Sequence, residues 1–330
     1  MPFTLSHAAA VLPAVRADGT GRGRLVPAVL VAGSFAPDMT YYAASVISGA
    51  MEFGDVTHSF PGVFTVDVLV AWALVWLWLL VREPLVALLP RARQPRPAAL
   101  LRCGARPARV RAPLVARWYA SAALGALTHV VWDAFTHPDR WGVRVFPVLT
   151  RGLAGFPLYW YLQYAGSAVA AAVIAVWLAR AVRRAPTGSG ARAENAGGTD
   201  ARTTGADTTG TRTTGADTTD ARTTDAGVTG AACARVPGVP LLSVRDRWWA
   251  GAVVGGCTAV GAVERATRWW TYRGATAELW ELIPGVCFGA GAGLVLGLLL
   301  HGAGVRVWRP VPASREPERV SAEGGRPAGR

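Results

Sequence analysis

Three polar side chains recur at every fourth position of an otherwise apolar stretch, namely His129, Asp133 and His137. On an α-helix each four-residue step turns about 40° beyond a full circle, so these side chains form one slanting stripe along a single face. A histidine and a second ligand at positions i and i+4 can hold one cation between them, as in zinc-binding helices. An ionised carboxylate among Val, Trp, Ala and Phe is costly to bury unless it is paired or bound to a metal. The stretch therefore predicts a metal or catalytic site, with a structural polar network as the alternative.

The composition indicates which kind of protein carries this stretch. The chain has 330 residues, is 52% hydrophobic and contains 14 Trp. Its apolar residues are gathered into long blocks separated by basic or Gly/Thr-rich stretches, the distribution of a polytopic, all-α helical membrane protein. The formal charge of +13 comes from Arg, because the sequence has no Lys. Since nothing resembles an aromatic-interleaved basic surface or a zinc finger, we expect no nucleic-acid partner and assign the arginines to the lipid bilayer surface.

The helices that would position the stripe can be read from the apolar blocks. The stripe's own helix should run from about Trp118 to Thr136, because Pro138 biases His137 away from helical geometry. Residues 63–81 and 157–179 are each long enough to cross a bilayer, and aromatic residues and arginines mark the two ends of the second. Between them, residues 82–117 should form a basic loop or a partly ordered hairpin, since no apolar period is sustained there.

Two shorter apolar segments precede these spans. Residues 4–15 should form a short helix with His7 in its first turn, and residues 25–37 a second one. Pro37 should break that helix and leave Asp38 at a helix end, available for chemistry. A polar and aromatic connection over residues 40–62 follows, and it contains His58. Asp67, in the first turns of the next span, should lie near a membrane interface.

The remaining chain divides into regions of contrasting composition. We expect a helical membrane domain over 1–184, a disordered Thr/Gly/Ala/Asp-rich linker over 185–240, a two-helix membrane hairpin over 241–305 and a flexible basic tail over 306–330. Glycines at four-residue spacing would let the hairpin helices approach closely. The members of this series are Gly251, Gly255, Gly285, Gly289, Gly293 and Gly297.

The distribution of arginines predicts an orientation in the cell membrane. Segments 82–117, 180–247 and 306–330 carry the positive charge and should be cytoplasmic. The linker and the tail would then lie inside, in a multi-pass arrangement. The same assignment places His7, Asp38, His58 and His137 together toward the outer face.

Four sequence blocks resemble an uncharacterised bacterial membrane family, domain of unknown function 4184. They are Met1–Leu12, Gly33–Asp38, His58–Gly62 and Gly125–His137, and the resemblance covers about residues 1–180. More distantly, the order of His and Asp residues is similar to the ligand order of membrane-bound metal-dependent hydrolases and of the zinc-dependent phospholipase C and nuclease superfamily. That resemblance implies divalent-metal ligands, with Asp133 able to bridge two metals, at His7, Asp38, His58, His129, Asp133 and His137.

Two functional hypotheses follow, and they belong to different classes. In the first, the chain is a membrane-embedded, zinc-dependent hydrolase of a phosphoester or lipid, in which Asp38 or Asp133 is a metal ligand or the catalytic general base. In the second, it is a non-enzymatic membrane protein whose polar cluster packs helices or binds a metal structurally. Transport along an intramembrane His/Asp path is a third hypothesis, weakened by the confinement of the cluster to one side. The sequence predicts no particular oligomeric state.

Overall fold

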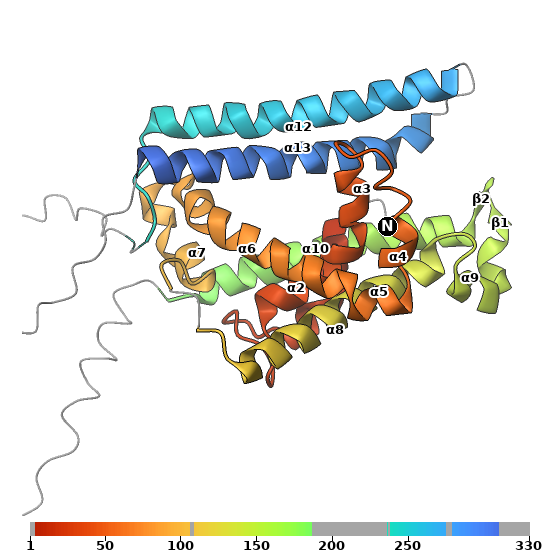
Figure 1. Cartoon of the computed structure of the whole chain (residues 1–330), viewed down its shortest axis with the longest axis horizontal. Helices are drawn as coiled ribbons and strands as arrows, with labels where there is room; N and C mark the ends of the chain where they lie inside the picture. Colours follow the sequence, from red (N-terminus) through yellow and green to blue (C-terminus); the bar gives the residue numbers. More distant parts are fainter. Residues whose placement is uncertain (1–3, 106–108, 187–235, 237, 275–278, 310–330) are drawn as a thin grey trace, which may run out of the picture.

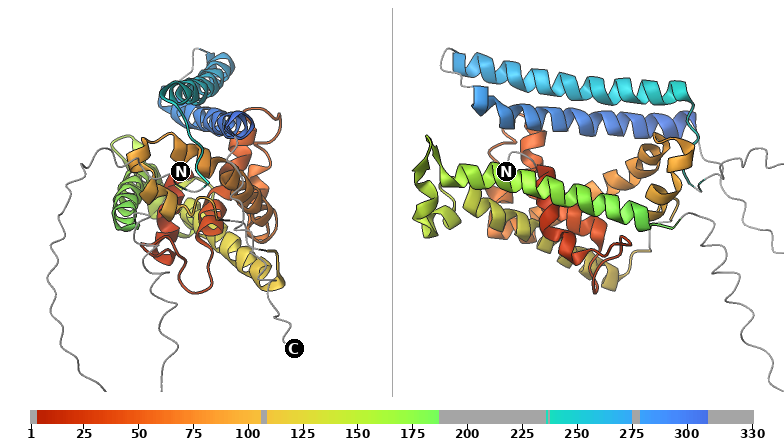
Figure 2. Two further views of the ribbon diagram at one scale, coloured as in Figure 1. Left: turned by 90° about the vertical axis from the view of Figure 1, so that its left-hand side faces the viewer. Right: turned by 180° about the vertical axis from the view of Figure 1, so that it is seen from behind.

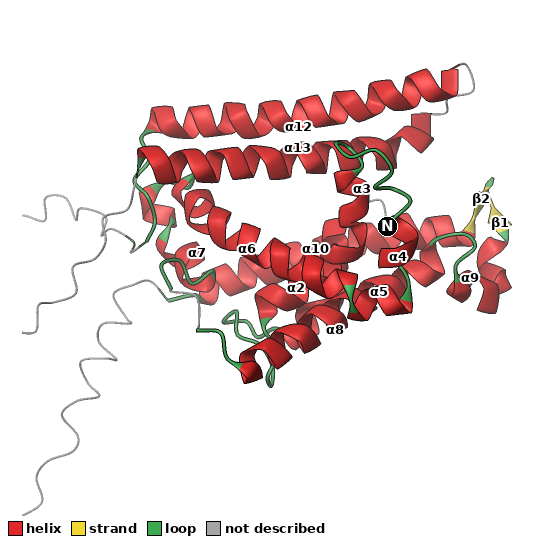
Figure 3. Cartoon of the chain, viewed as in Figure 1, coloured by secondary structure: helices red, strands yellow, loops and turns green. Residues whose placement is uncertain are grey.

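The computed structural model describes residues 4–105, 109–186, 236, 238–274 and 279–309. In these ranges the chain is almost entirely helical, and its two short strands form one hairpin (Figure 3), which confirms the all-α prediction. Most of the predicted linker and tail lies outside the described residues. The N-terminal elements are η1 Thr4–His7, α1 Ala8–Val11, η2 Leu12–Ala14, α2 Pro27–Phe35, η3 Ala36–Asp38, α3 Met39–Ala43, α4 Gly54–Thr57 and α5 Phe60–Phe64. The remaining elements are α6 Val66–Ala87, η4 Arg91–Arg93, α7 Pro95–Leu100, α8 Ala112–Thr136, α9 Trp141–Val145, η5 Pro147–Thr150, β1 Gly152–Leu153, β2 Phe156–Pro157, α10 Leu158–Arg184, α12 Val244–Arg273 and α13 Leu279–Trp308.

The centre of the fold is a packed layer of α2, α6 and α8 (Figure 1). Small and β-branched side chains fill the space between these helices, namely Val29, Ala32, Ala36, Val68, Ala71, Val75, Ala122 and Ala123. Asp67 lies beside them and is fully buried, so it points into the bundle, while its position near a membrane interface stays a prediction. Neither of its carboxylate oxygens has a hydrogen-bond partner among the described residues.

Two glycines set the distance between α2 and α8. A Cβ atom added at Gly125 would overlap the backbone oxygen of Leu30, and one added at Gly33 would overlap that of Ala122. Since glycine has no side chain, it permits backbones to approach in this way. The stripe on α8 is therefore held directly against the backbone of α2.

The N-terminal turns are packed between α10 and the central layer. Both η1 and α1 contact α10 and α2 (Figure 2, right), so residues that begin the chain are enclosed by a helix that lies far along it. The predicted break at Pro37 takes the form of the tighter 3-10 turn η3, after which α3 continues. Asp38 ends that turn and is buried, whereas we expected it only at a helix end.

Helices α12 and α13 form an antiparallel pair along one edge of the molecule (Figures 1 and 2). Gly289, Gly293 and Gly297 lie at this contact as predicted, and Gly293 approaches the backbone of Cys257 so closely that a Cβ atom there would overlap it. Gly251, Gly255 and Gly285 have open space around the Cβ position instead. For these three the predicted packing role was wrong, and Gly261 makes the close approach from α12.

Residues 82–117 include helices where we expected a basic loop or a partly ordered hairpin. Helix α6 continues to Ala87 and includes a buried ion pair, with 2.7 Å between Arg82 Nε and Glu83 Oε1. Pro84 has no N–H to donate to the carbonyl of Leu80, four residues earlier. Arg306 of α13 donates to that carbonyl at 2.8 Å, so the missing helical bond is replaced by one that ties the hairpin to α6. Helices η4 and α7 and the start of α8 cover part of the rest.

Three helices among the described residues are long and apolar enough to span a membrane: Val66–Ala87, Leu158–Arg184 and Leu282–Trp308. They indicate a membrane protein. Helices α8 and α12, which we also expected to cross, are not among them, so their crossing stays a prediction. In Figure 1 the end of α10, the start of α12 and the end of α13 lie at one end of the molecule, and the β1–β2 hairpin lies at the other.

Candidate metal centre

Four parts of the chain that are distant in sequence meet at one buried cluster. Helix α8 supplies the stripe, and the C-terminal ends of η1, η3 and α4 supply one side chain each. The helix stops where Pro138 predicts, since His137 is its C-cap and has extended backbone angles. All six residues that the sequence singled out come together: His7, Asp38, His58, His129, Asp133 and His137.

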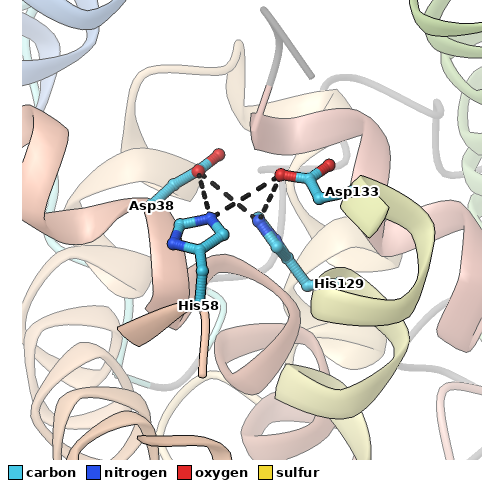
Figure 4. Close-up of side chains that lie close together, drawn as sticks. All are labelled: Asp38, His58, His129 and Asp133. Atoms are coloured by element: carbon cyan, nitrogen blue, oxygen red, sulfur yellow. Dashed lines mark ion pairs between the residues drawn. The ribbon is translucent and has the colours of Figure 1, made fainter. Parts of the chain in front are cut away.

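Four of the six residues converge their ligand atoms on one point, as Figure 4 shows. His129 Nε2 lies 3.4 Å from Asp38 Oδ1 and 3.3 Å from Asp133 Oδ2. His58 Nε2 lies 3.5 Å from Asp38 Oδ1 and 3.6 Å from Asp133 Oδ2. All four atoms lie within 4.8 Å of one another, and all four residues are buried. We call these four residues the cage.

The spacing in the cage suits a metal better than direct hydrogen bonds. A charge-assisted N–H···O bond is about 2.7–2.9 Å long, shorter than every imidazole–carboxylate separation in the cage. Ligands about 2.0–2.1 Å from a tetrahedral zinc ion lie about 3.3–3.4 Å from each other, close to the four imidazole–carboxylate separations. The other two pairs of ligand atoms lie within 4.8 Å of each other. The cage could therefore hold one metal ion.

The outer nitrogens of both cage histidines are fixed by backbone carbonyls. His129 Nδ1 lies 2.8 Å from the oxygen of Ser34, and His58 Nδ1 lies 2.9 Å from that of Gly54. A carbonyl only accepts, so each Nδ1 carries the proton and donates it. In the neutral imidazoles this leaves the Nε2 lone pairs directed at the carboxylates, the arrangement found around metal-ligating histidines.

Charge balance also favours a divalent ion. Burial opposes ionisation of Asp38, but the charge of His129 and the nearby imidazoles of His129 and His58 outweigh it, so the pKa of Asp38 is held well below its ordinary value. Burial likewise opposes the charged form of His58, yet its contacts with Asp133 and Asp38 prevail and raise its pKa. Without metal, two carboxylates face protonated imidazoles. Because one divalent cation carries the charge of two Nε2 protons, it can replace them with no net change in the buried charge.

The other two predicted ligands lie beside the cage rather than in the four-atom set. His7 stacks on His129 with 3.6 Å between ring centroids, and its Nε2 lies 3.5 Å from Asp133 Oδ1. Burial and the charge of His129 lower the pKa of His7 well below its ordinary value, which keeps it neutral. His137 Nδ1 lies 3.7 Å from Asp133 Oδ2, and its Nε2 contacts Gln163. Both histidines therefore contact Asp133 from outside the cage.

Sequence reasoning missed the residues that support the cage. The hydroxyl of Thr4 donates to Asp38 Oδ2 at 2.6 Å, and that of Thr57 donates to the carbonyl of Pro37 at 2.8 Å. Both threonines are buried. Thr57 precedes His58 directly, and Thr4 lies three residues before His7. Proximity to a candidate ligand was the only sequence signal, and it does not tell which hydroxyl turns inward.

A pocket of about 150 Å³ reaches the cage from outside. Its wall includes His58 and Asp133, the two cage residues with the greatest exposure, at 8% and 4%. The remaining lining residues are Val130, Ala134, Asp139, Arg140, Trp141 and Arg144. A small molecule could therefore approach the metal position along the edge formed by His58 and Asp133.

Comparison with known proteins identifies a family but no characterised relative. No curated protein and no solved structure matches the chain. The family described as a domain of unknown function, DUF4184, matches residues 1–301, which is longer than the 1–180 that the sequence blocks suggested because it includes the hairpin. Since this match covers most of the chain, the protein belongs to the DUF4184 family.

Proposed function

We propose that this protein is a membrane-bound hydrolase that uses a divalent metal, zinc by its donor set, to cleave a phosphoester of a lipid. The observation that carries the proposal is the pocket that meets the cage at His58 and Asp133. Imidazole and carboxylate donors together suit zinc. A metal that only stabilised the fold would not need a path from outside to its ligands.

The bound metal would supply two things, a lowered pKa for a coordinated water and neutralisation of charge on phosphate oxygens. In the reaction, the oxygen of water bonds to phosphorus while the phosphorus–oxygen bond to the alcohol breaks, and the departing alkoxide takes up a proton. Asp133 borders the pocket, which supports a role for its carboxylate as the acceptor of the proton that the water loses. Asp38 is more deeply buried and its Oδ2 accepts the Thr4 hydroxyl, which favours a ligand role alone.

A structural metal site is the second candidate function, and one observation favours it. Zinc sites that serve structure are closed by four protein ligands, whereas catalytic sites keep one position for water. The cage offers four ligand atoms. The two candidates therefore differ in whether a substrate reaches the ion.

Hydrolysis by metal-stripped and zinc-restored protein separates the two. We expect the full chain in detergent to release phosphate or alcohol from p-nitrophenyl phosphate or from phospholipid vesicles, to lose this activity to a chelator and to regain it with zinc. His129→Ala should lose both metal and activity, while His301→Ala, which changes a histidine on α13 that contacts Pro84, should keep both. Activity that survives metal removal would contradict the proposal. Stoichiometric metal without cleavage of any phosphoester would favour the structural role.

A further inference from the structure

The lining of the pocket includes two arginines besides the cage residues His58 and Asp133. Arg140 is the N-cap of α9 and Arg144 lies one helical turn later, so their side chains share a face of that helix and both line the pocket. Arg140 Nη2 makes a 3.7 Å contact with Asp55 Oδ1, but Asp55 is 90% exposed and such a contact contributes little. Arg144 has no ion pair with any described residue. Both guanidinium groups are therefore available to a ligand.

The pocket lining also includes a tryptophan. The indole nitrogen of Trp141 is buried, and no acceptor lies within hydrogen-bond distance of it among the described residues. Trp141 lines the pocket. Its ring is held by an edge contact with Phe135 and a tilted contact with Phe60, at centroid distances of 5.4 Å and 6.4 Å. The nitrogen itself has almost no accessible surface, so Trp141 contributes its ring to the pocket wall and the two arginines remain the donors there.

The guanidinium groups that line the pocket are suited to bind an anion with several acceptor oxygens. Guanidinium groups match the geometry of phosphate through paired N–H···O bonds. Asp139 is the one lining carboxylate outside the cage; it is exposed and adjoins Arg140. The pocket is smaller than the roughly 300–1,000 Å³ of pockets that enclose whole small molecules. It can take a phosphoryl group but not the remainder of a large substrate.

The surface beside the pocket is apolar. Phe60, which contacts Trp141, is 49% exposed, and Val145 and Phe146 of the α9 segment are 63% and 51% exposed. A substrate whose phosphoryl group entered the pocket would have its remaining part against these side chains. Apolar chains would gain by covering them.

We propose that this pocket is a phosphoryl-binding site in which Arg140 and Arg144 bind the substrate's phosphate oxygens beside the cage. The identification of the bound phosphoryl group as part of a substrate rests on the proposed hydrolase function. Phosphate binding itself can be measured without any reaction. A phosphoryl group held there contacts the arginines and lies beside the edge of the cage formed by His58 and Asp133.

The test is calorimetric binding of inorganic phosphate to the zinc-loaded full chain in detergent. We expect the Arg140→Gln/Arg144→Gln double variant to bind phosphate at least 10-fold more weakly, since two charged donors are lost. The corresponding Lys variant should retain part of the affinity through its charge. Arg151→Gln is the matched control, because Arg151 is exposed, belongs to the same connection and does not line the pocket. Zinc content and thermal midpoint should be unchanged in all variants, which separates binding from damage to the cage.

The outcomes distinguish the pocket from the reaction. Three results would contradict the phosphoryl-binding site. They are a wild type that binds no phosphate, a Gln double variant that binds phosphate as tightly as the wild type, and an Arg151→Gln variant that loses as much phosphate affinity as the double variant. Arginine-dependent phosphate binding without cleavage of any phosphoester would uphold the pocket and contradict the hydrolase. Phosphoester cleavage with the same KM in the Gln double variant as in the wild type would support the hydrolase function and contradict the proposed phosphoryl-binding site. A parallel titration with glycerol phosphate and dihexanoyl phosphatidic acid separates a free phosphate ester from a lipid headgroup, and tighter arginine-dependent binding of the lipid identifies the latter.

Discussion

At the residue scale, the cage consists of common metal-ligand side chains whose orientations are fixed by hydrogen bonds to neighbouring groups. Backbone carbonyls of Ser34 and Gly54 fix both histidine rings, and the Thr4 hydroxyl fixes one carboxylate. Such supporting contacts orient ligands and raise their basicity. Of these three, only the Thr4 contact can be removed by a side-chain substitution that leaves all ligands in place.

Thr4→Val should weaken metal binding while the fold persists. The substitution keeps the shape of the side chain but leaves Asp38 Oδ2 without its hydroxyl donor, so we expect zinc affinity to fall about 10–100-fold. Competition with a chromophoric chelator measures it. Thr65→Val is the control, because the Thr65 hydroxyl bonds only to the carbonyl of Pro61 outside the cage. Equal zinc affinity in wild type and Thr4→Val would show that this contact does not position the ligand.

How much of the site the sequence predicted depends on how local each signal is. The pair His129 and Asp133 follows from helical spacing alone, because ligands four residues apart share a face. Asp38, His58 and His7 could be joined to them only through resemblance and an assumed topology, since no local rule brings distant turns together. The arginines of the pocket were visible in the sequence, but their relation to the cage depends on how the chain turns after Pro138.

At the element scale, the approach of α2 to α8 builds the site. The backbone carbonyl of Ser34 on α2 accepts a hydrogen bond from Nδ1 of His129 on α8, and this bond requires the two backbones to be close. Gly33 and Gly125 permit that distance. The same pair of helices also carries the apolar core, so packing and ligand geometry depend on one contact.

Gly125→Ala should therefore harm stability and metal binding together. The new methyl group would overlap the Leu30 carbonyl and approach the backbone of Ser34, which forces the helices apart at a cost of about 1–3 kcal/mol. We expect a lower thermal midpoint and weaker zinc binding. Gly251→Ala places the same methyl group in open space on α12 and should lower neither. A Gly125→Ala protein as stable and as tight for zinc as the control would contradict this explanation.

The element boundaries show where sequence patterns stop being informative. Apolar runs predicted α6, α10 and α13, but each helix extends past its run into charged residues. In α6 the carbonyl that Pro84 leaves unpaired accepts from Arg306 of α13, a tertiary contact that a local pattern cannot reveal. Glycine spacing predicted the α12–α13 pairing, yet it could not identify which glycines face the partner.

At the scale of the whole molecule, the end of α10 and the end of α13 lie together with α7 at the same end of the structure, away from the β1–β2 hairpin (Figure 1). Both helices carry arginines in their last turns. Helix α12, which ends with Arg273, reaches the opposite end, so arginines are not confined to one end. From the positive-inside rule we expect the end that carries α7 and the ends of α10 and α13 to be cytoplasmic.

A topology reporter tests that orientation. Fused after Arg184, a reporter active only in the cytoplasm should be active, and one active only outside the cytoplasm should be silent. The reverse result for both reporters would invert the orientation. The cage and its chemistry would not be affected by that inversion.

The central claim is that two imidazoles and two carboxylates from distant turns bind one metal ion. X-ray absorption spectroscopy of the purified full chain after loading with zinc tests it most directly. We predict about one zinc per chain, a first shell of nitrogen and oxygen at about 2.0–2.2 Å, and outer-shell scattering from two imidazole rings that is reduced in His129→Ala. Absence of stoichiometric zinc, or a first shell without imidazole, would contradict the claim.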